Sequence, residues 1–153
     1  MYKVSLAIPI YNVSLFVERA LLSALNQTYD NIEYLIVDDK GQDDSMDIVH
    51  RIIKDHPRGK DVRIIEHPYN IGLGATRNTA IDNAQGEYLF FMDSDDEIIP
   101  TCIEILVHKM QEHPVDFIAA SHMKKDLSGK TYPTYTYSPI LIQGDDLPVA
   151  QYR

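Results

Sequence analysis

Apolar residues follow two alternating kinds of spacing along this chain. Short runs that alternate like a strand, or that are apolar throughout, occur at residues 4–9, 32–37, 62–65, 88–92 and 115–120. Between the first four runs, and after the fourth, apolar residues recur three or four positions apart, which is the spacing of one helix face. These helix-like segments cover residues 17–27, 43–56, 74–86 and 101–113. The pattern therefore predicts strands that alternate with helices.

Such alternation predicts an α/β fold with a mostly parallel, Rossmann-like sheet and helices on both faces. The uninterrupted apolar run at residues 88–92 is typical of a central strand that is buried on both faces. Right-handed crossovers place every strand-to-helix loop at the same edge of the sheet. Polar clusters at residues 9–11, 38–39, 69–74 and 93–96 fall in these loops. Because ligands bind outside the carboxyl ends of such strands, we expect the four clusters to line one cleft.

The pattern is weaker after residue 120. Residues 131–137 alternate like an exposed strand or one arm of a hairpin, and Pro133 favours an edge position. Residues 144–153 resemble the opening of a helix with Asp145 or Asp146 as its cap. The sequence stops within that pattern, which resembles a cut, so we expect a fold that is truncated at its C-terminal end.

Charge excludes one class of partner. The 153 residues carry 14 basic and 23 acidic side chains, for a net charge of −9. A general nucleic-acid or anionic-membrane binder needs a basic surface, so no nucleic-acid partner is expected. The single cysteine, Cys102, cannot form an internal disulfide. No apolar stretch is long enough to span a membrane, and no secretion signal is present, so we expect a cytoplasmic protein, with peripheral association at the inner face of the membrane left open.

Acidic residues at two predicted strand ends are the first candidates for chemistry. Asp93 and Asp95 flank Ser94, and two carboxylates so placed can bind a hard divalent cation that keeps phosphate oxygens in its shell. A solvated acidic turn explains the same segment equally well. Asp38 is either a ligand or a turn former, whereas Asp39 is placed to accept a hydrogen bond from a base or ribose.

Residues in the other loops have similar pairs of interpretations. Asp43 and Asp44 are better explained as helix caps than as ligands. Tyr11, just past Pro9, either stacks on a planar base or is an ordinary exposed tyrosine. Asn70, Gly72, Gly74 and Arg77 form either a phosphate-binding loop, in which glycines allow close backbone approach, or a plain loop with a surface arginine. The histidines show no zinc-type spacing and are interpreted as surface or loop residues: His50, His56, His67, His108, His113 and His122.

Three other classes of α/β protein fit the sequence poorly. A dinucleotide-binding fold needs G-x-G-x-x-G after its first strand, but here the glycine pair follows the third strand and lacks the last glycine. A receiver domain places its acidic pair after strand one, whereas here the pair follows strand two. A haloacid-dehalogenase phosphatase carries D-x-D on its first strand, which here ends at Pro9.

Four linked segments carry a family resemblance: VSLAIPIYN, LNQTYDNIEYLIVDD, NIGLGATRNTAI and GEYLFFMDSDDEI. Their order and spacing resemble those of family 2 glycosyltransferases, which have the GT-A fold. The resemblance covers residues 3–120. It implies a nucleotide-sugar-binding α/β core at residues 1–121 and the start of an incomplete acceptor-side region at residues 122–153.

The resemblance also implies roles for individual residues. Pro9 to Tyr11 would line a uridine pocket, with Tyr11 against the base and Asp39 accepting from it. Asn70 and Arg77 would lie near the donor, the arginine beside the diphosphate. Asp93, Ser94 and Asp95 would complete the donor site, with Asp93 by the ribose and metal and Asp95 holding Mn²⁺ or Mg²⁺. The metal would stabilise the departing nucleoside diphosphate as a Lewis acid.

Two departures from the family pattern qualify these expectations. Lys40-Gly41 stands where family members commonly have Gly-Ser. The carboxylate base of inverting members comes further along the chain, so it is expected beyond Arg153, and Asp145 and Asp146 are poorly spaced substitutes. We therefore expect a metal-dependent glycosyltransferase domain that binds a UDP-linked sugar. It would transfer the sugar with inversion to a saccharide or lipid-linked acceptor. The alternative is a non-catalytic binding module of the same fold.

Overall fold

The computed structural model describes residues 1–126 and 128–135. The chain divides into two compact units, Met1–His113 and Pro114–Arg153. The first unit holds a four-stranded parallel sheet, and the second holds an antiparallel strand pair in its described part. In the part of the chain that the structure describes, no helix is both long and apolar enough to cross a bilayer.

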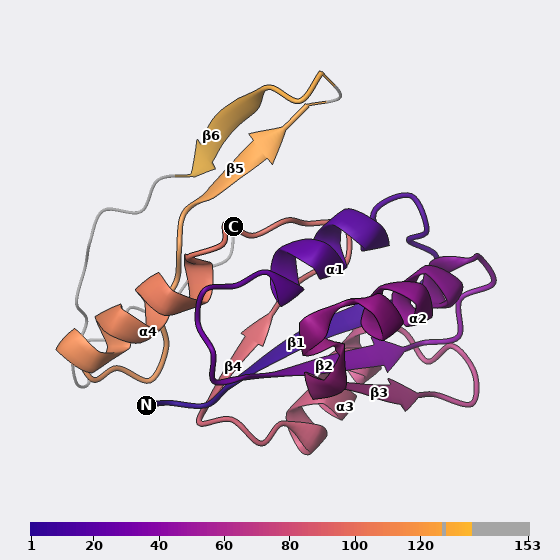
Figure 1. Ribbon diagram of the computed structural model, residues 1–153, viewed down its shortest axis with the longest axis horizontal. Helices are drawn as coiled ribbons and strands as arrows, with labels where there is room; N and C mark the ends of the chain where they lie inside the picture. The colour runs from indigo at the N-terminus through magenta and orange to yellow at the C-terminus, as the bar shows by residue number, and fades with distance from the viewer. Residues whose placement is uncertain (127, 136–153) are drawn as a thin grey trace. The chain divides into compact units, whose positions relative to one another are not determined.

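The sheet of the first unit has the order β3-β2-β1-β4 (Figure 1). Its strands are β1 (Val4–Ile10), β2 (Ile32–Asp38), β3 (Val62–Glu66) and β4 (Tyr88–Phe91). The helices are α1 (Val17–Leu25), α2 (Ser45–Asp55), α3 (Leu73–Asn83) and α4 (Cys102–Glu112), with a short 3-10 turn, η1 (Pro57–Asp61). All three strand pairings are parallel, so the predicted α/β fold with alternating elements is confirmed.

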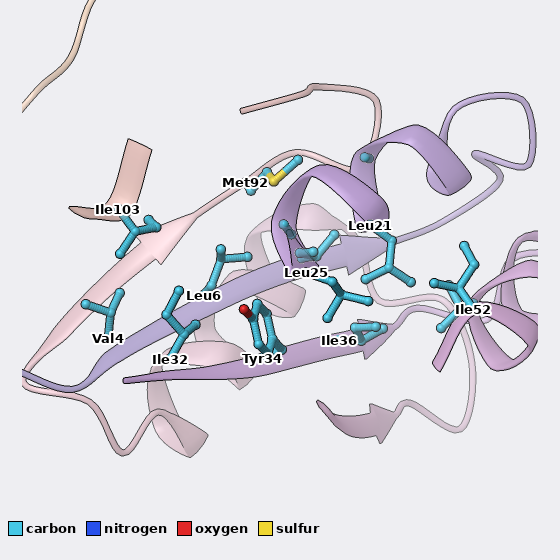
Figure 2. Packing of buried hydrophobic residues seen from close by; sticks show 14 of the residues in the cluster. Val4, Leu6, Leu21, Leu25, Ile32, Tyr34, Ile36, Ile52, Met92 and Ile103 are labelled. Carbon is cyan, nitrogen blue, oxygen red and sulfur yellow. The ribbon is translucent and has the colours of Figure 1, made fainter. Parts of the chain in front are cut away.

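Side chains alternate between the two faces of the sheet, and each face packs against different helices. One face carries the large core, in which β1 and β2 residues such as Leu6 and Ile36 pack against Leu21 and Leu25 of α1 (Figure 2). The other face carries a smaller cluster, in which Ala7, Leu35 and Val37 pack with Ala80 of α3. Full burial of one leucine contributes about 1.5–3 kcal/mol, so the α1 side provides most of the hydrophobic stabilisation.

The position of β4 differs from the expectation for an apolar run. β4 pairs with β1 and forms an edge of the sheet within the described residues, rather than a central strand. Its residues are only half-buried, and Phe91 is 37% exposed. An apolar run shows that a strand can be covered on both faces, but it does not show which neighbours are present.

The second unit corrects one predicted strand and confirms another. Residues 115–120 are not a strand and are mostly exposed. Instead β5 (His122–Lys125) pairs with β6 (Thr131–Tyr135) as an antiparallel hairpin. A strand forms only where a neighbouring strand hydrogen-bonds to it. Here β6 pairs with the polar segment His122–Lys125, and not with the more apolar residues 115–120. Pro133 sits in this two-stranded edge as expected, opposite Met123 beside an irregularity of register. The helix expected at residues 144–153 lies outside the described residues.

Candidate functional site

The four polar loop clusters meet at the carboxyl edge of the sheet in the first unit. They line an open cleft of about 510 Å³. The lining residues are Pro9, Ile10, Tyr11, Val13, Asp39, Asn70, Gly72, Leu73, Thr76, Asp93, Ser94 and Asp95. Every residue predicted for the donor site lines this cleft except Arg77, whose guanidinium reaches Asp93. The sequence thus identified the cleft, although the roles assigned to these residues stay predictions.

Hydrogen bonds hold the loop after β1 against the start of α2. Ser14 N–H donates to Asp43 Oδ2 at 2.8 Å, and Val13 N–H donates to Ser45 Oγ at 2.8 Å. Asp43 Oδ1 also accepts from Ser45 N–H at 3.1 Å, which supports its interpretation as a residue that organises the helix start. Asp44 occupies the N-cap position without a side-chain hydrogen bond. This loop is therefore well anchored, and it presents a half-exposed Tyr11 to the cleft.

Asp39 is the most highly coordinated carboxylate of the cleft. It follows β2, two residues beyond Val37, so strand alternation points it to the α3 side of the sheet. Oδ1 accepts from the His67 ring at 2.8 Å and from Ile71 N–H at 2.9 Å. Oδ2 accepts from Asn70 Nδ2 and from Gly72 N–H, both at 2.9 Å. A carboxylate offers about four acceptor positions, so protein donors already saturate Asp39.

The pKa of Asp39 reflects two opposing effects. Asp39 is only 3% exposed, and this burial disfavours its charged form. Taken together, hydrogen bonds from Ile71, His67 and Gly72 outweigh this effect and hold the pKa of Asp39 below its ordinary value. Asp39 is therefore an anion inside the protein, stabilised by the loop that it organises.

His67 is the buried partner that the sequence did not reveal. The sequence predicted a surface or loop position for His67. It does lie in the loop after β3, but it is not a surface residue, because only 6% of it is exposed. Its ring lies between Asp39 and Thr79 of α3, with His67 Nε2 2.9 Å from Thr79 Oγ1. An isolated histidine after a strand has no spacing signal that would mark it as buried.

Asp38 behaves as a turn former, which was one of its two interpretations. It ends β2 and accepts from Lys40 N–H at 2.8 Å. Lys40 Nζ lies 3.2 Å from Asp38 Oδ2 and 2.6 Å from Glu66 Oε2. Lys40 has a φ of 55°, a left-handed conformation that glycine adopts more easily. Its ion pairs thus hold a lysine at the position where the family commonly has glycine.

The segment after β4 has the opposite character. Asp93 and Asp95 are exposed, while Ser94 between them is buried. Arg77 of α3 donates from Nη2 to Asp93 Oδ1 at 2.8 Å, with the two side chains 40% and 48% exposed. Within the described residues, the Asp95 carboxylate has neither a hydrogen-bond nor an ion-pair partner. An unpaired anion therefore lines the cleft beside an arginine–aspartate pair.

These carboxylates suit a divalent cation that completes its shell with ligand oxygens. No group of three or more histidine, cysteine, aspartate or glutamate side chains gathers in the described part of the chain. Asp93 and Asp95 are too few ligands to enclose a metal alone. Mg²⁺ and Mn²⁺, however, are commonly held by one or two carboxylates plus phosphate oxygens. The donor set fits a cation that binds together with an anionic ligand.

Some lining residues were not expected from the sequence. Ile10, Val13, Leu73 and Thr76 make part of the cleft wall, and Thr76 is buried. Leu73 stands between the two glycines of the loop, so its place could have been inferred from that motif. The others carry only core-like or helical signals, and they reach the cleft because of the way the loops pack.

Comparisons with known proteins agree with this geometry. The glycosyl transferase family 2 model matches residues 5–147. An uncharacterized glycosyltransferase of Haemophilus influenzae is 32% identical over 151 residues, covering 95% of this chain and 59% of the relative. The Escherichia coli enzyme WfaP, a UDP-Glc:alpha-D-GlcNAc-diphosphoundecaprenol beta-1,3-glucosyltransferase, is 38% identical over 129 residues, covering 82% and 49%. The chain thus spans about half the length of these relatives.

Solved structures share the fold. Residues 1–349 of Staphylococcus aureus TarS, in complex with UDP-GlcNAc, match with a TM-score of 0.68 and 26% identity, covering 86% of this chain and 37% of TarS. A Pyrobaculum calidifontis mannosyltransferase, solved with GDP-Man and Mn²⁺, has a TM-score of 0.68, and its 24% identity shows the fold alone. The coverage is 74% of this chain and 34% of that enzyme. The fold is GT-A, and with a family model that matches nearly its whole length, this chain belongs to glycosyl transferase family 2.

Proposed function

We propose that this chain forms the nucleotide-sugar donor site of a metal-dependent glycosyltransferase. The observation that carries the proposal is the Asp95 carboxylate, which has no partner in the described part of the chain and lines one cleft together with Asp93, Tyr11 and Asn70. Unpaired carboxylates repel an anionic ligand, so a diphosphate can bind beside them only with a cation. The UDP-GlcNAc complex of TarS and the UDP-glucose in the name of WfaP support a UDP-linked donor.

The proposed roles follow the positions of the side chains. Asp95 and Asp93 would hold Mn²⁺ or Mg²⁺, which as a Lewis acid supplies charge stabilisation to the departing nucleoside diphosphate. Arg77 would exchange its contact with Asp93 for the diphosphate. Tyr11 would stack on the base, beside Pro9 and above the strand ends. Ser94, buried between the two aspartates, would orient them from behind.

Asp39 has a more specific role in this proposal. All of its acceptor positions are filled, so a base N–H can reach it only by replacing a protein donor. Asn70 Nδ2 is the donor most easily replaced, because Asn70 is exposed and lines the cleft, whereas His67 is buried. Asn70 would then act as a stand-in for the ligand when the site holds no nucleotide.

The remaining proposals concern the whole protein. Residues 1–121 would bind the donor, and residues 122–153 would begin the acceptor side. The name of WfaP and that of a Campylobacter jejuni relative, GalNAc(5)-diNAcBac-PP-undecaprenol beta-1,3-glucosyltransferase, support a saccharide acceptor on a lipid diphosphate. Transfer would invert the anomeric centre, with its base outside this chain. Such an acceptor would favour a site of action at the inner face of the membrane.

Calorimetric titration of UDP, GDP and dTDP, each with and without Mn²⁺, tests the donor site. We expect UDP to bind only with metal, and Asp95→Asn to weaken that binding by about tenfold or more. Asp82→Asn, an exposed aspartate of α3 that does not line the cleft, is the matched control and should bind as the unaltered chain does. Equal UDP affinity for the Asp95→Asn and Asp82→Asn variants would refute the assignment of the metal site. Binding of no diphosphate would favour the non-catalytic module.

A further inference from the structure

His67 connects three parts of the first unit. Its backbone N–H donates to Asp38 O at 2.9 Å, which extends the β2–β3 ladder by one residue. Its ring then contacts Asp39 after β2 and Thr79 on α3, through Nδ1 and Nε2 respectively. A buried ring with a partner on each nitrogen has a fixed orientation.

The hydrogen-bond partners determine where the ring protons lie. Asp39 is an anion, and it can only accept, so Nδ1 must carry a proton. Thr79 Oγ1 also lies 3.1 Å from Ala75 O, one turn earlier on α3. The hydroxyl has one hydrogen, which goes either to Nε2 of a neutral ring or to Ala75 O when Nε2 is itself protonated. In both arrangements Nδ1–H donates to Asp39.

The Nδ1 hydrogen bond controls the aspartate that organises the cleft loop. Asp39 binds the backbone N–H groups of Ile71 and Gly72 and the side chain of Asn70. Gly72 has a φ of 89°, which only glycine adopts easily. The N–H groups of Ile71 and Gly72 both donate to Asp39, so the carboxylate fixes the backbone at this turn. Without the His67 donor, Oδ1 would lose one of its two partners, and the carboxylate would be free to rotate away from the loop.

We propose that His67 is a positioning residue of the donor site, which orients Asp39 through Nδ1–H so that Asn70 to Gly72 are held at the cleft. Its importance for nucleotide binding rests on the proposed function, but its effect on the loop does not. Within the ring, this role belongs to Nδ1. Nε2 and Thr79 secure the ring from the side of α3.

Two isosteric substitutions separate the ring nitrogens. Asparagine places its amide near Nδ1, so His67→Asn keeps a donor for Asp39 and loses Thr79. Glutamine places its amide near Nε2, so His67→Gln keeps Thr79 and leaves Oδ1 without its donor. His56 is the matched control, because it is also a loop histidine with partners on both nitrogens, Arg58 N–H and Asn26, and it does not line the cleft.

The first readout is amide hydrogen exchange at Ile71 and Gly72, compared with the global stability of each variant. We expect exchange at these two amides to rise about tenfold or more in His67→Gln and to change little in His67→Asn. His56→Asn and His56→Gln should leave both amides unchanged. Equal exchange in the two His67 variants would overturn the proposal, because a general packing role does not distinguish the two nitrogens.

The second readout is UDP affinity in the presence of Mn²⁺. We expect His67→Gln to weaken binding by about tenfold and His67→Asn to remain near the unaltered chain. A ring ¹⁵N spectrum that shows Nδ1 without a proton would also overturn the proposal, whatever the variants do. If the unaltered chain binds no nucleotide, the proposed function fails, while the exchange data still decide the role of His67 in the loop.

Discussion

Two acidic strand ends meet at the cleft, and they differ in almost every physical respect. Asp39, after β2, is 3% exposed and accepts four hydrogen bonds from the protein. Asp93 and Asp95, after β4, are exposed, and Asp95 has no partner within the described residues. Protein donors satisfy Asp39, whereas Asp93 has one exposed ion pair, with Arg77. Aspartates at equivalent places in a fold thus have different hydrogen-bonding environments when the neighbouring loops differ.

The sheet explains the difference. β2 lies between β1 and β3, so the loop after β3 folds over its end and supplies donors to Asp39. β4 is an edge of the sheet within the described residues, and α3 supplies Asp93 with one donor, Arg77. Asp39 and Asp93 both point to the α3 side, as the alternation of Val37 and Leu89 on that face requires. The number of neighbouring loops therefore determines how fully each carboxylate is satisfied.

Stability measurements should separate the two strand ends most strongly. Asp39→Ala removes the acceptor of four donors, and we expect it to lower the free energy of unfolding by about 3–5 kcal/mol. Asp95→Ala removes an exposed group that has no partner among the described residues, and it should change the free energy of unfolding by less than about 0.5 kcal/mol. Urea denaturation followed by circular dichroism measures both. Similar losses for the two variants would mean that its burial and hydrogen bonds do not make Asp39 contribute more to stability than Asp95.

The pH dependence of stability sharpens the comparison. The pKa of Asp39 in the folded protein is lower than its ordinary value of 3.8. Its contribution is therefore present above that value and is lost as the pH falls toward the lower, folded-state pKa. Unfolding free energies measured from neutral pH down to the acid range should decrease less steeply below pH 3.8 in Asp39→Asn than in the unaltered chain. Parallel curves would show that Asp39 is not the stabilised anion described here.

The smallest expected effect on stability is at Lys40, the residue that follows the buried Asp39. Lys40→Gly relieves the left-handed backbone but removes the ion pairs to Asp38 and Glu66, which are partly exposed. These contributions oppose one another, so the free energy of unfolding should change little. Thermal melts at low and high salt would resolve them, because salt screens only the ion pairs. A loss of several kcal/mol would show that Asp38 depends on Lys40.

Much of this protein could be predicted from the order of its residues. Periodicity predicted the strands and helices of the first unit, because a side-chain period of two or of three to four follows directly from backbone geometry. The chirality of the crossovers then placed Pro9, Asp39, Asn70 and Asp93 at one edge. The family resemblance of four linked segments is likewise a property of the sequence, and the family model confirms it.

Only the tertiary structure decided which of these residues are buried, paired or open. The sequence placed residues 88–92 in a central strand and residues 115–120 in a further one, because apolar character records a capacity for burial and not the neighbours that provide it. It likewise left His67 among the surface and loop histidines. Hydrogen bonds between residues far apart in the chain satisfy Asp39, and no local pattern encodes them. Asp95, by contrast, has no partner among the residues that the structure describes.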